Sequence, residues 1–315
     1  SFFLLKAQNT VHVNGKIVDF NPAETYYLSN GEFGVPLELS ADGSFEVDMS
    51  YNELPAFLNF KKYTKGGNRV HLVPRIWFES NSIDLTINMA SSSFETQKVM
   101  PYQEISERIE ALKGKSQNDF LIKNPNHWPS LYFADRNKTE MRLADLEDML
   151  QRIEEKYKNS AYIKRIESYV MAKRISPAKK GKKVADFFLK DKNGKDIPLL
   201  ENKDKTKLIA LFTSGCSYSI ASIDLLAKIN EMSNDKIEII TIWEDDSKSS
   251  WLNGSKEEKE KITWTSLWDE TGFAANYLNR KLWPSFYVIN SEGILVDKFQ
   301  GYTQKTADKL KELVE

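Results

Sequence analysis

The chain has 315 residues, with 44 lysines and arginines against 45 aspartates and glutamates, and one cysteine. This length favours two or three folding units over a single small domain. The balanced charge gives no ground for bulk attraction to nucleic acid or to a membrane surface, so we expect no nucleic-acid partner. No apolar run approaches the roughly 20 residues of a membrane span. A single cysteine excludes an internal disulfide.

Residues 1–100 have the pattern of a β-rich domain. The segment 11–18 alternates apolar and polar residues and contains Gly15, which is suited to a β-bulge. Asp42-Gly43 predicts a turn. Short strands at regular turn spacing predict a small antiparallel β-sandwich. Further strands are expected at 25–29, 36–40, 44–48, 58–60, 69–78 and 83–87.

The first residues, Ser1 to Leu5, lack a methionine and are too short for a signal peptide, which indicates a processed or trimmed chain.

Residues 101–176 are predicted to be a helical linker region. Ile105, Ile109 and Leu112 share one helical face. The segment 124–130 contains two prolines and predicts a loop. The segment 145–158 carries charges of both signs, which is typical of a solvated helix face.

Residues 177–315 alternate strands and helices, which predicts a mixed α/β layer. The overall prediction is therefore a multidomain α+β protein: an N-terminal antiparallel β-sandwich, a helical linker and a C-terminal α/β domain. In the last part we expect a hairpin at 187–199, strands at 207–212, 237–243, 285–290 and 294–299, and helices at 219–233, 272–278 and 303–315.

The segment from Leu208 to Ile220 organises the C-terminal part. It starts as an apolar run typical of a buried strand, turns at Thr213-Ser214-Gly215, and continues with helical spacing of apolar residues. Cys216 is thus expected where a strand ends and a helix begins. The unpaired N–H groups and the dipole of a helix N-terminus favour a thiolate there.

Three segments resemble the TlpA/redoxin-like thioredoxin-fold thiol-disulfide oxidoreductases of Bacteroidetes type. Cys216-Ser217-Tyr218-Ser219 matches the family's Cys-x-x-Cys, with Ser219 in place of the second cysteine. The segment 282–290 is similar to the cis-proline loop, and 181–189 is similar to the Gly-x-x-Ala-Pro-Asp-Phe motif, with Ala185 at the proline position. The resemblance implies that the C-terminal α/β domain is thioredoxin-like.

The N-terminal part resembles the β-rich domain found ahead of redoxin domains in Bacteroidetes proteins. The matching pieces are 13–17, 42–45 and 81–87. Resemblance to TlpA-like Bacteroidetes proteins implies a periplasmic or cell-envelope location, with association to the envelope as one option. The expectation of no membrane span comes from the short apolar runs alone.

The resemblance also implies the site. Cys216, Ser219 and Pro284 take the catalytic positions, and Pro284 would be the cis-proline that offers backbone groups to an extended substrate. The substrate groove would be formed by Gly215, Ser217, Tyr218 and Trp283. Two uses of Tyr218 stay open, a hydrogen bond to the sulfur or simple packing. Thioredoxin has a buried acid six residues before its first cysteine, where this chain has Ala210.

The chemistry depends on what one thiol can do. In the dithiol cycle a second thiolate resolves the mixed disulfide, and the hydroxyl of Ser219 cannot do so. Three outcomes remain open: Cys216 shuffles disulfides with the substrate's own thiol as resolving group; it is released from a mixed disulfide by an external thiol; or Ser219 is an engineered substrate trap. The expected partners are protein or small-molecule thiols and disulfides, including a redox partner protein, and no cofactor is expected.

Functions other than thiol–disulfide exchange make different demands on the residues. A catalytically silent thioredoxin-fold module could hold extended polypeptide across the groove. A peroxidase needs Pro-x-x-x-Thr-x-x-Cys, and here Thr213 is present but Ile209 replaces the proline. His12, His71 and His127 lie outside the C-terminal part, which argues against a cysteine hydrolase, and no metal site is expected. The basic run 179–183 is interpreted as an interdomain hinge rather than a polyanion site.

Overall fold

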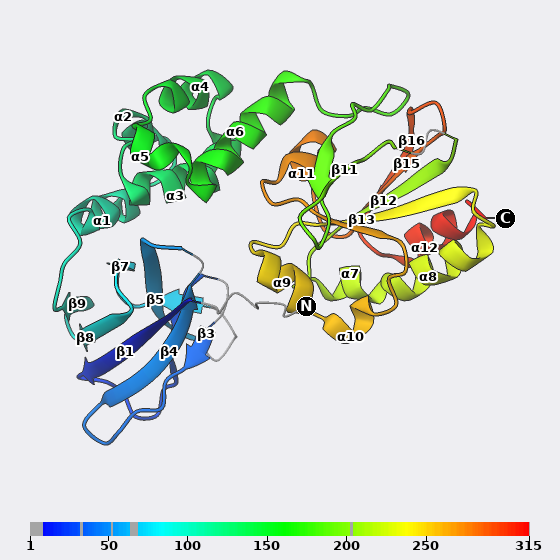
Figure 1. Cartoon of the computed structure of the whole chain (residues 1–315). Helices are drawn as coiled ribbons and strands as arrows, with labels where there is room; N and C mark the ends of the chain where they lie inside the picture. The colour runs from blue at the N-terminus through cyan, green and yellow to red at the C-terminus, as the bar shows by residue number, and fades with distance from the viewer. Residues whose placement is uncertain (1–8, 32–33, 52, 64–68, 202–203, 315) are drawn as a thin grey trace. The chain divides into compact units, whose positions relative to one another are not determined.

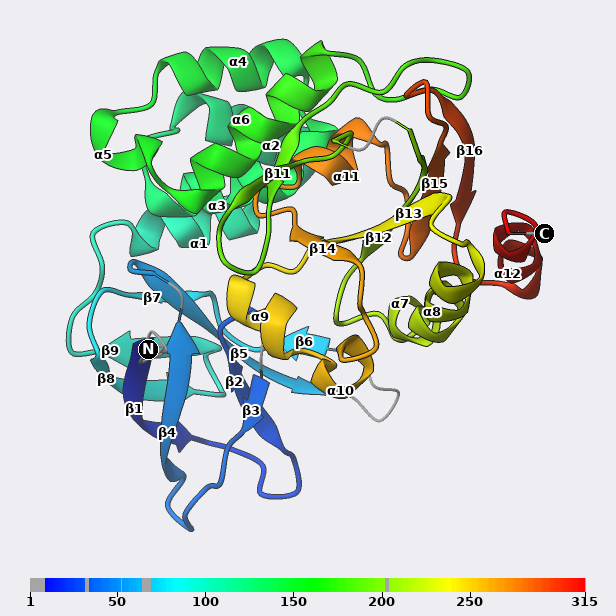
Figure 2. The ribbon, with the colours of Figure 1, turned by 45° about the vertical axis from the view of Figure 1, so that its right-hand side comes forward.

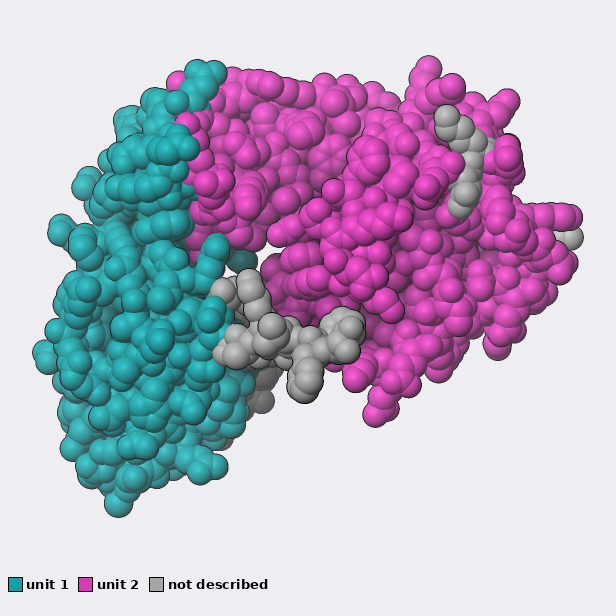
Figure 3. All heavy atoms as spheres, in the orientation of Figure 1, with its two compact units in different colours: residues 1–141, 151–157 teal, residues 142–150, 158–315 magenta. Residues whose placement is uncertain are grey.

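The computed structural model describes residues 9–31, 34–51, 53–63, 69–201 and 204–314 (Figure 1). The chain divides into two compact units, coloured separately in Figure 3. Unit 1 comprises residues 1–141 and 151–157, and unit 2 comprises 142–150 and 158–315. The helices of 101–176 are thus shared between the two units, and the division at 100 and 176 stays a prediction. The segment Ser1 to Leu5 lies outside the described residues.

Unit 1 begins with two β-sheets. One has the strand order β4-β1-β8-β9; the other has the order β3-β2-β5-β6, with β7 paired to β5. Neighbouring strands are antiparallel except β1 and β8, which run parallel. The strands are β1 (Asn9–Val18), β2 (Tyr26–Ser29), β3 (Gly34–Pro36), β4 (Ser44–Tyr51), β5 (Ala56–Tyr63), β6 (Arg69–His71), β7 (Ile76–Phe78), β8 (Ser82–Asn88) and β9 (Ser93–Thr96).

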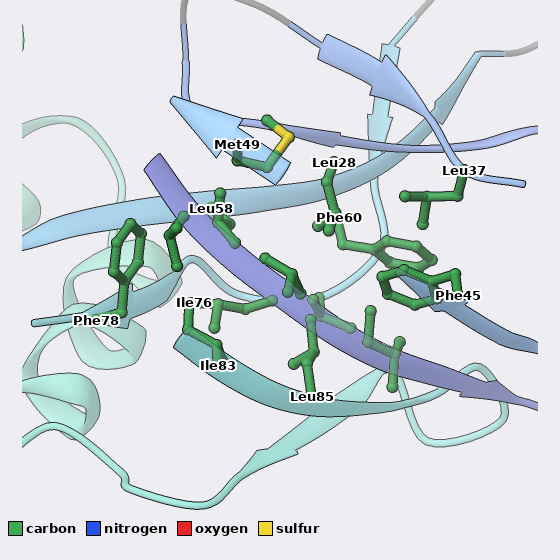
Figure 4. Close-up of a cluster of buried hydrophobic side chains, with 14 of the residues drawn as sticks. Leu28, Leu37, Phe45, Met49, Leu58, Phe60, Ile76, Phe78, Ile83 and Leu85 are labelled. Carbon is green, nitrogen blue, oxygen red and sulfur yellow. The ribbon is translucent and has the colours of Figure 1, made fainter. Parts of the chain in front are cut away.

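The two sheets share one apolar core, so the predicted sandwich is confirmed. Val11, Val13 and Ile17 of β1 are buried while their neighbours in the strand are exposed, as the alternation of a half-buried strand requires. Side chains from both sheets meet in this core, among them Leu28 of β2 and Leu85 of β8, shown in Figure 4.

Two predictions in this region are wrong. Gly15 is not at a bulge, because β1 pairs in unbroken register on both sides. It makes room instead: a Cβ at Gly15 would lie 2.1 Å from the ring of Phe45. The strand expected at 36–40 ends at Pro36, and only the amide of Leu37 continues toward β2, donating to the carbonyl of Tyr26 over 2.8 Å. Strand β9 was not predicted.

The helical region differs from prediction at one place. The loop expected at 124–130 ends early, because α3 begins at Trp128 and contains Pro129 in its first turn, where a missing N–H costs nothing. No helix of the described ranges is both long and apolar enough to cross a membrane. The helices are α1 (Gln103–Ala111), α2 (Gly114–Lys123), α3 (Trp128–Asn137), α4 (Leu143–Gln151), α5 (Glu155–Lys158) and α6 (Ala161–Arg174), with a 3-10 turn, η1 (Lys138–Glu140).

Unit 2 contains a seven-stranded mixed sheet with the order β11-β10-β14-β13-β12-β15-β16. Strand β12 is parallel to β13 and antiparallel to β15. Its elements are β10 (Phe188–Lys190), β11 (Asp196–Pro198), β12 (Thr206–Phe212), α7 (Ser217–Ala221), α8 (Ile223–Met232), β13 (Ile237–Trp243), α9 (Lys248–Asn253), α10 (Lys256–Lys259), β14 (Thr265–Trp268), α11 (Phe273–Tyr277), β15 (Ser285–Ile289), β16 (Leu295–Gln300) and α12 (Gln304–Lys311).

Helices cover both faces of this sheet (Figures 1 and 2), which explains why β12 is apolar from Leu208 to Phe212. Leu208 and Phe212 face a core shared with α8 and α12, whereas Ile209 and Leu211 face a core shared with α11. The predicted multidomain α+β class is confirmed. One prediction is wrong here: the helix expected at 219–233 is two helices, interrupted at Ser222, whose hydroxyl donates to the carbonyl of Ser219 over 2.7 Å.

Candidate active site

Cys216 lies where β12 gives way to α7, as the sequence predicted. It is the N-cap residue of α7, with φ −105° and ψ 111°. Its amide donates to the carbonyl of Thr213 over 3.1 Å, which closes the turn after the strand, and its carbonyl accepts from the amide of Ile220 over 3.2 Å. The thiol is free and half-buried. The local sequence therefore presents one accessible sulfur at the end of the central strand.

The loop before β15 lies opposite the thiol. The peptide bond between Trp283 and Pro284 is cis, as predicted. The Sγ of Cys216 donates to the carbonyl of Trp283 over 3.8 Å. A buried strand, a cysteine at a helix start and a later cis-proline beside that cysteine therefore come together in unit 2. The fold is thioredoxin-like.

The solved structures to which this chain is similar each match less than half of it. No protein-family model and no curated protein matches the chain. Among solved structures, it is similar to the thioredoxin domain of a thiol-disulfide oxidoreductase from Bacteroides vulgatus (18% identity, 44% of this chain and 99% of that one, TM-score 0.38). It is also similar to a thiol-disulfide oxidoreductase from Bacteroides fragilis (20%, 42% and 99%, 0.36) and to the pneumococcal exposed lipoprotein thioredoxin from Streptococcus pneumoniae (25%, 41% and 99%, 0.34).

Pro284 was expected to offer its backbone groups to a substrate, but its carbonyl is already paired. The carbonyl of Pro284 accepts from the amide of Gly301 over 2.8 Å, so it is already used within the sheet edge. The carbonyl that faces the sulfur belongs to Trp283. The hydroxyl of Ser285 donates to the carbonyl of Leu282 over 2.6 Å and fixes the turn.

The predicted groove residues are at the surface. Tyr218 is 62% exposed and Trp283 is 36% exposed. Gly215 and Ser217 line a surface pocket of about 530 Å³, which is also lined by Glu258 of α10. The exposure of Tyr218 argues against core packing of this side chain.

Ser219 lies on the inner side of α7. It has no exposed surface, and its Oγ has no hydrogen-bond partner among the described residues. A hydroxyl of this kind adds no exchange chemistry to Cys216.

The turn before the thiol is held by Asp245, a residue that the sequence analysis did not single out. The Asp245 carboxylate accepts from the Thr213 hydroxyl over 3.2 Å, and from the Ser214 amide and hydroxyl over 2.9 Å each. Asp245 is buried, with 8% of its surface exposed. The hydroxyl of Thr213, half of the peroxidase pattern, is thus bound to a carboxylate.

Lys259 of α10 adds a cation to this support. Its Nζ donates to the Ser214 hydroxyl over 2.6 Å and to the carbonyl of Trp251, and lies 4.0 Å from the ring centre of Trp243. Burial lowers the pKa of Lys259 from 10.5 to about 8, against the opposing effect of the Asp245 charge. An ammonium with this pKa is partly neutral at mildly alkaline pH.

The cis-proline loop is held by Glu244, the residue before Asp245. The indole Nε1 of Trp283 donates to Glu244 Oε1 over 3.0 Å, and Arg280 Nε lies 2.9 Å from Glu244 Oε2. The Arg280 guanidinium lies 4.1 Å from the ring centre of Trp283. Burial raises the pKa of Glu244 from 4.5 to about 7, although the Arg280 charge opposes this.

Asp269 completes this charged group. It follows β14 directly, accepts from the amide of Ala275 over 3.0 Å, and is 3% exposed. Burial raises the pKa of Asp269 to about 6. Ala210 of β12 takes the position at which thioredoxin has its buried acid. The acids come instead after β13, which pairs with β12, and after β14, which pairs with β13. The signal for the first two was the run Glu244-Asp245-Asp246 at the end of an apolar strand.

The three histidines belong to unit 1, whereas the residues of this site belong to unit 2. His12 pairs with Asp48 over 2.9 Å, and both are exposed. Within the described ranges, no three His, Cys, Asp or Glu side chains are grouped as metal ligands.

Proposed function

We propose that the protein carries out thiol–disulfide exchange through Cys216, as a disulfide isomerase or a monothiol variant of a reductase. The observation that supports this most is the thiol at the start of α7 with the Trp283 carbonyl 3.8 Å from its sulfur. In the proposal Cys216 is the nucleophile, Pro284 fixes the facing loop, and Ser219 occupies the place of a resolving cysteine. Gly215, Ser217, Tyr218 and Trp283 border the substrate.

The proposed reaction needs no cofactor. The Cys216 thiolate attacks one sulfur of a substrate disulfide, RS–SR′, so that the Cys216–SR bond forms while R′S⁻ leaves and takes a proton from solvent. A second thiolate of the substrate then attacks the SR sulfur and releases Cys216 unchanged. An external thiol can do the same and stays on the substrate as a new mixed disulfide. No step uses Ser219 as a nucleophile.

The proposed setting follows the sequence resemblance. We place the protein with TlpA/redoxin-like proteins of Bacteroidetes type that carry a β-rich N-terminal domain, and propose a periplasmic or envelope location. Its partners there would be protein or small-molecule thiols and disulfides, including a redox partner protein.

Two observations favour a second function, that of a binding module without turnover. Cys216 is the sole cysteine, and Ser219 is buried. A thiol without a built-in resolving group can hold a partner as a mixed disulfide, or the groove can hold extended polypeptide without covalent chemistry.

Intact-mass measurement tests the proposal. Wild-type protein incubated with a small oxidised disulfide is expected to gain one half of that disulfide and to lose it when a reducing thiol is added. Cys216→Ala provides the blank. An unmodified mass for folded wild-type protein, with labelling only after denaturation, would contradict the proposal and leave the binding module.

A further inference from the structure

We infer that Glu244 is a positioning residue for the exchange site: its carboxylate holds the cis-proline loop so that the Trp283 carbonyl stays against the sulfur of Cys216. This inference rests on the proposed function, because it assigns a role in the reactivity of that sulfur. Glu244 itself touches no substrate.

The contacts form a continuous chain from β13 to the thiol. Glu244 follows the last residue of β13, and its two oxygens are used separately, one by the Trp283 indole and one by Arg280. The guanidinium of Arg280 also stacks on the Trp283 ring. The Trp283 side chain is therefore fixed by its donor atom and by one ring face, and its backbone carbonyl accepts from Cys216.

One carboxylate, one guanidinium and one tyrosine hydroxyl surround Glu244. Arg280 and Asp269 face it from the segments after α11 and β14, and Tyr287 faces it from β15 with a buried hydroxyl. Burial raises the pKa values of both carboxylates to about 7 and about 6, with Arg280 opposing in each case. The group thus binds protons close to neutral pH, whereas the indole contact is charge-assisted only with an ionised Glu244.

This arrangement makes a directional prediction. As pH rises through about 7, Glu244 ionises, binds the indole and the guanidinium more strongly, and orders the loop. Glutamine keeps the shape and one acceptor oxygen but cannot ionise. The Trp283 carbonyl accepts from the protonated thiol and so disfavours the thiolate, which is the form that reacts. Wild type and Glu244→Gln should therefore react alike at pH 5 and diverge at pH 8, where wild type reacts about tenfold more slowly, the effect of one charge-assisted hydrogen bond.

The test measures the rate of Cys216 alkylation by iodoacetamide from pH 5 to 9 in wild type, Glu244→Gln and Glu312→Gln. Glu312 is an exposed acid paired with Lys309, so its variant should follow wild type at every pH. A wild-type to Glu244→Gln ratio of alkylation rates that falls near pH 7 supports the inference; a ratio that stays constant across the range or rises overturns it. Alkylation needs no disulfide, so this ratio reports on Glu244 even if the exchange reaction of the proposed function fails.

A spectroscopic measurement guards against a purely structural effect. The Trp283 contribution to fluorescence, taken as the difference between each protein and its Trp283→Phe counterpart, isolates one of seven tryptophans. It should change with a midpoint near pH 7 in wild type and stay flat in Glu244→Gln. The same transition in both proteins would overturn the inference.

Discussion

Two loops meet at Cys216, and consecutive residues of one strand end hold them. Asp245 binds the turn before the thiol through the Ser214 amide and hydroxyl. Glu244 binds the cis-proline loop through the Trp283 indole. Both acids follow β13, the strand beside the one that leads to Cys216.

The two supports differ in kind. Asp245 accepts from hydroxyl and amide groups that belong to the turn itself, whereas Glu244 lies in a buried group with Arg280 and a second carboxylate, Asp269. The turn should therefore respond mainly to lost hydrogen bonds and to crowding. The cis-proline loop should respond mainly to pH and charge. Variants can separate these two kinds of response.

The largest effect is expected from a change that leaves both supports intact. Ser219→Cys adds a second thiol at the family's resolving position, and should convert a protein without net dithiol turnover into one that reduces a protein disulfide and becomes oxidised itself. Insulin reduction with a coupled reductant measures this gain. The control is Ser222→Cys, another buried serine. Equal activity in both variants would show that position 219 has no special relation to Cys216.

Removing the first support should cost stability. Asp245→Ala leaves the Thr213 and Ser214 donors without their acceptor, which should lower the free energy of unfolding by about 3 kcal/mol. Urea unfolding measures the loss. Asp246→Ala is the matched control, because Asp246 is exposed. Coincident unfolding curves for the two variants would show that Asp245 does not stabilise the turn before Cys216.

Crowding the same turn from outside should have a smaller effect. A Cβ at Gly254 would lie 2.7 Å from Ser214 Cβ and 2.7 Å from the carbonyl oxygen of Ser250. Gly254→Ala should therefore destabilise by about 2 kcal/mol and slow Cys216 alkylation. The control Gly215→Ala has no neighbour within 4 Å of the new Cβ. A Gly254→Ala protein as stable as this control would show that the turn at Ser214 moves to accommodate the new Cβ at no cost in stability.

Lys259 should give the smallest effect, visible as a pH dependence. Its pKa is lowered to about 8 in the folded protein from 10.5, so between these values the unfolded chain binds more protons. The free energy of unfolding should accordingly rise between pH 8 and 10.5, and this rise should be reduced in Lys259→Met. Urea unfolding at several pH values measures it. If the free energy of unfolding rose equally with pH in both proteins, Lys259 would not have a pKa lowered by burial.

The sequence identified what is local and missed what depends on distant packing. Apolar runs predicted β12 and β13 because strands covered on both faces need no polar alternation. The cysteine and the cis-proline were found through a known motif. Glu244 was missed because an acid after a strand looks like a solvent-exposed turn, and only Trp283, 39 positions later, makes it a buried partner. The helix expected at 219–233 is interrupted at Ser222, whose hydroxyl donates to the carbonyl of Ser219. The spacing of apolar residues gives no sign of such a side-chain hydrogen bond.

Turnover on scrambled disulfides tests the central claim most directly. A small reduced-and-reoxidised protein with mispaired disulfides is incubated with catalytic amounts of this protein in a weak thiol buffer, and recovery of its native activity is followed. The account predicts recovery faster than buffer alone, with more than one substrate molecule repaired per Cys216, and no acceleration by Cys216→Ala. Recovery at the buffer rate, or repair that stops at one substrate per protein, would contradict catalytic exchange and identify unit 2 as a binding domain.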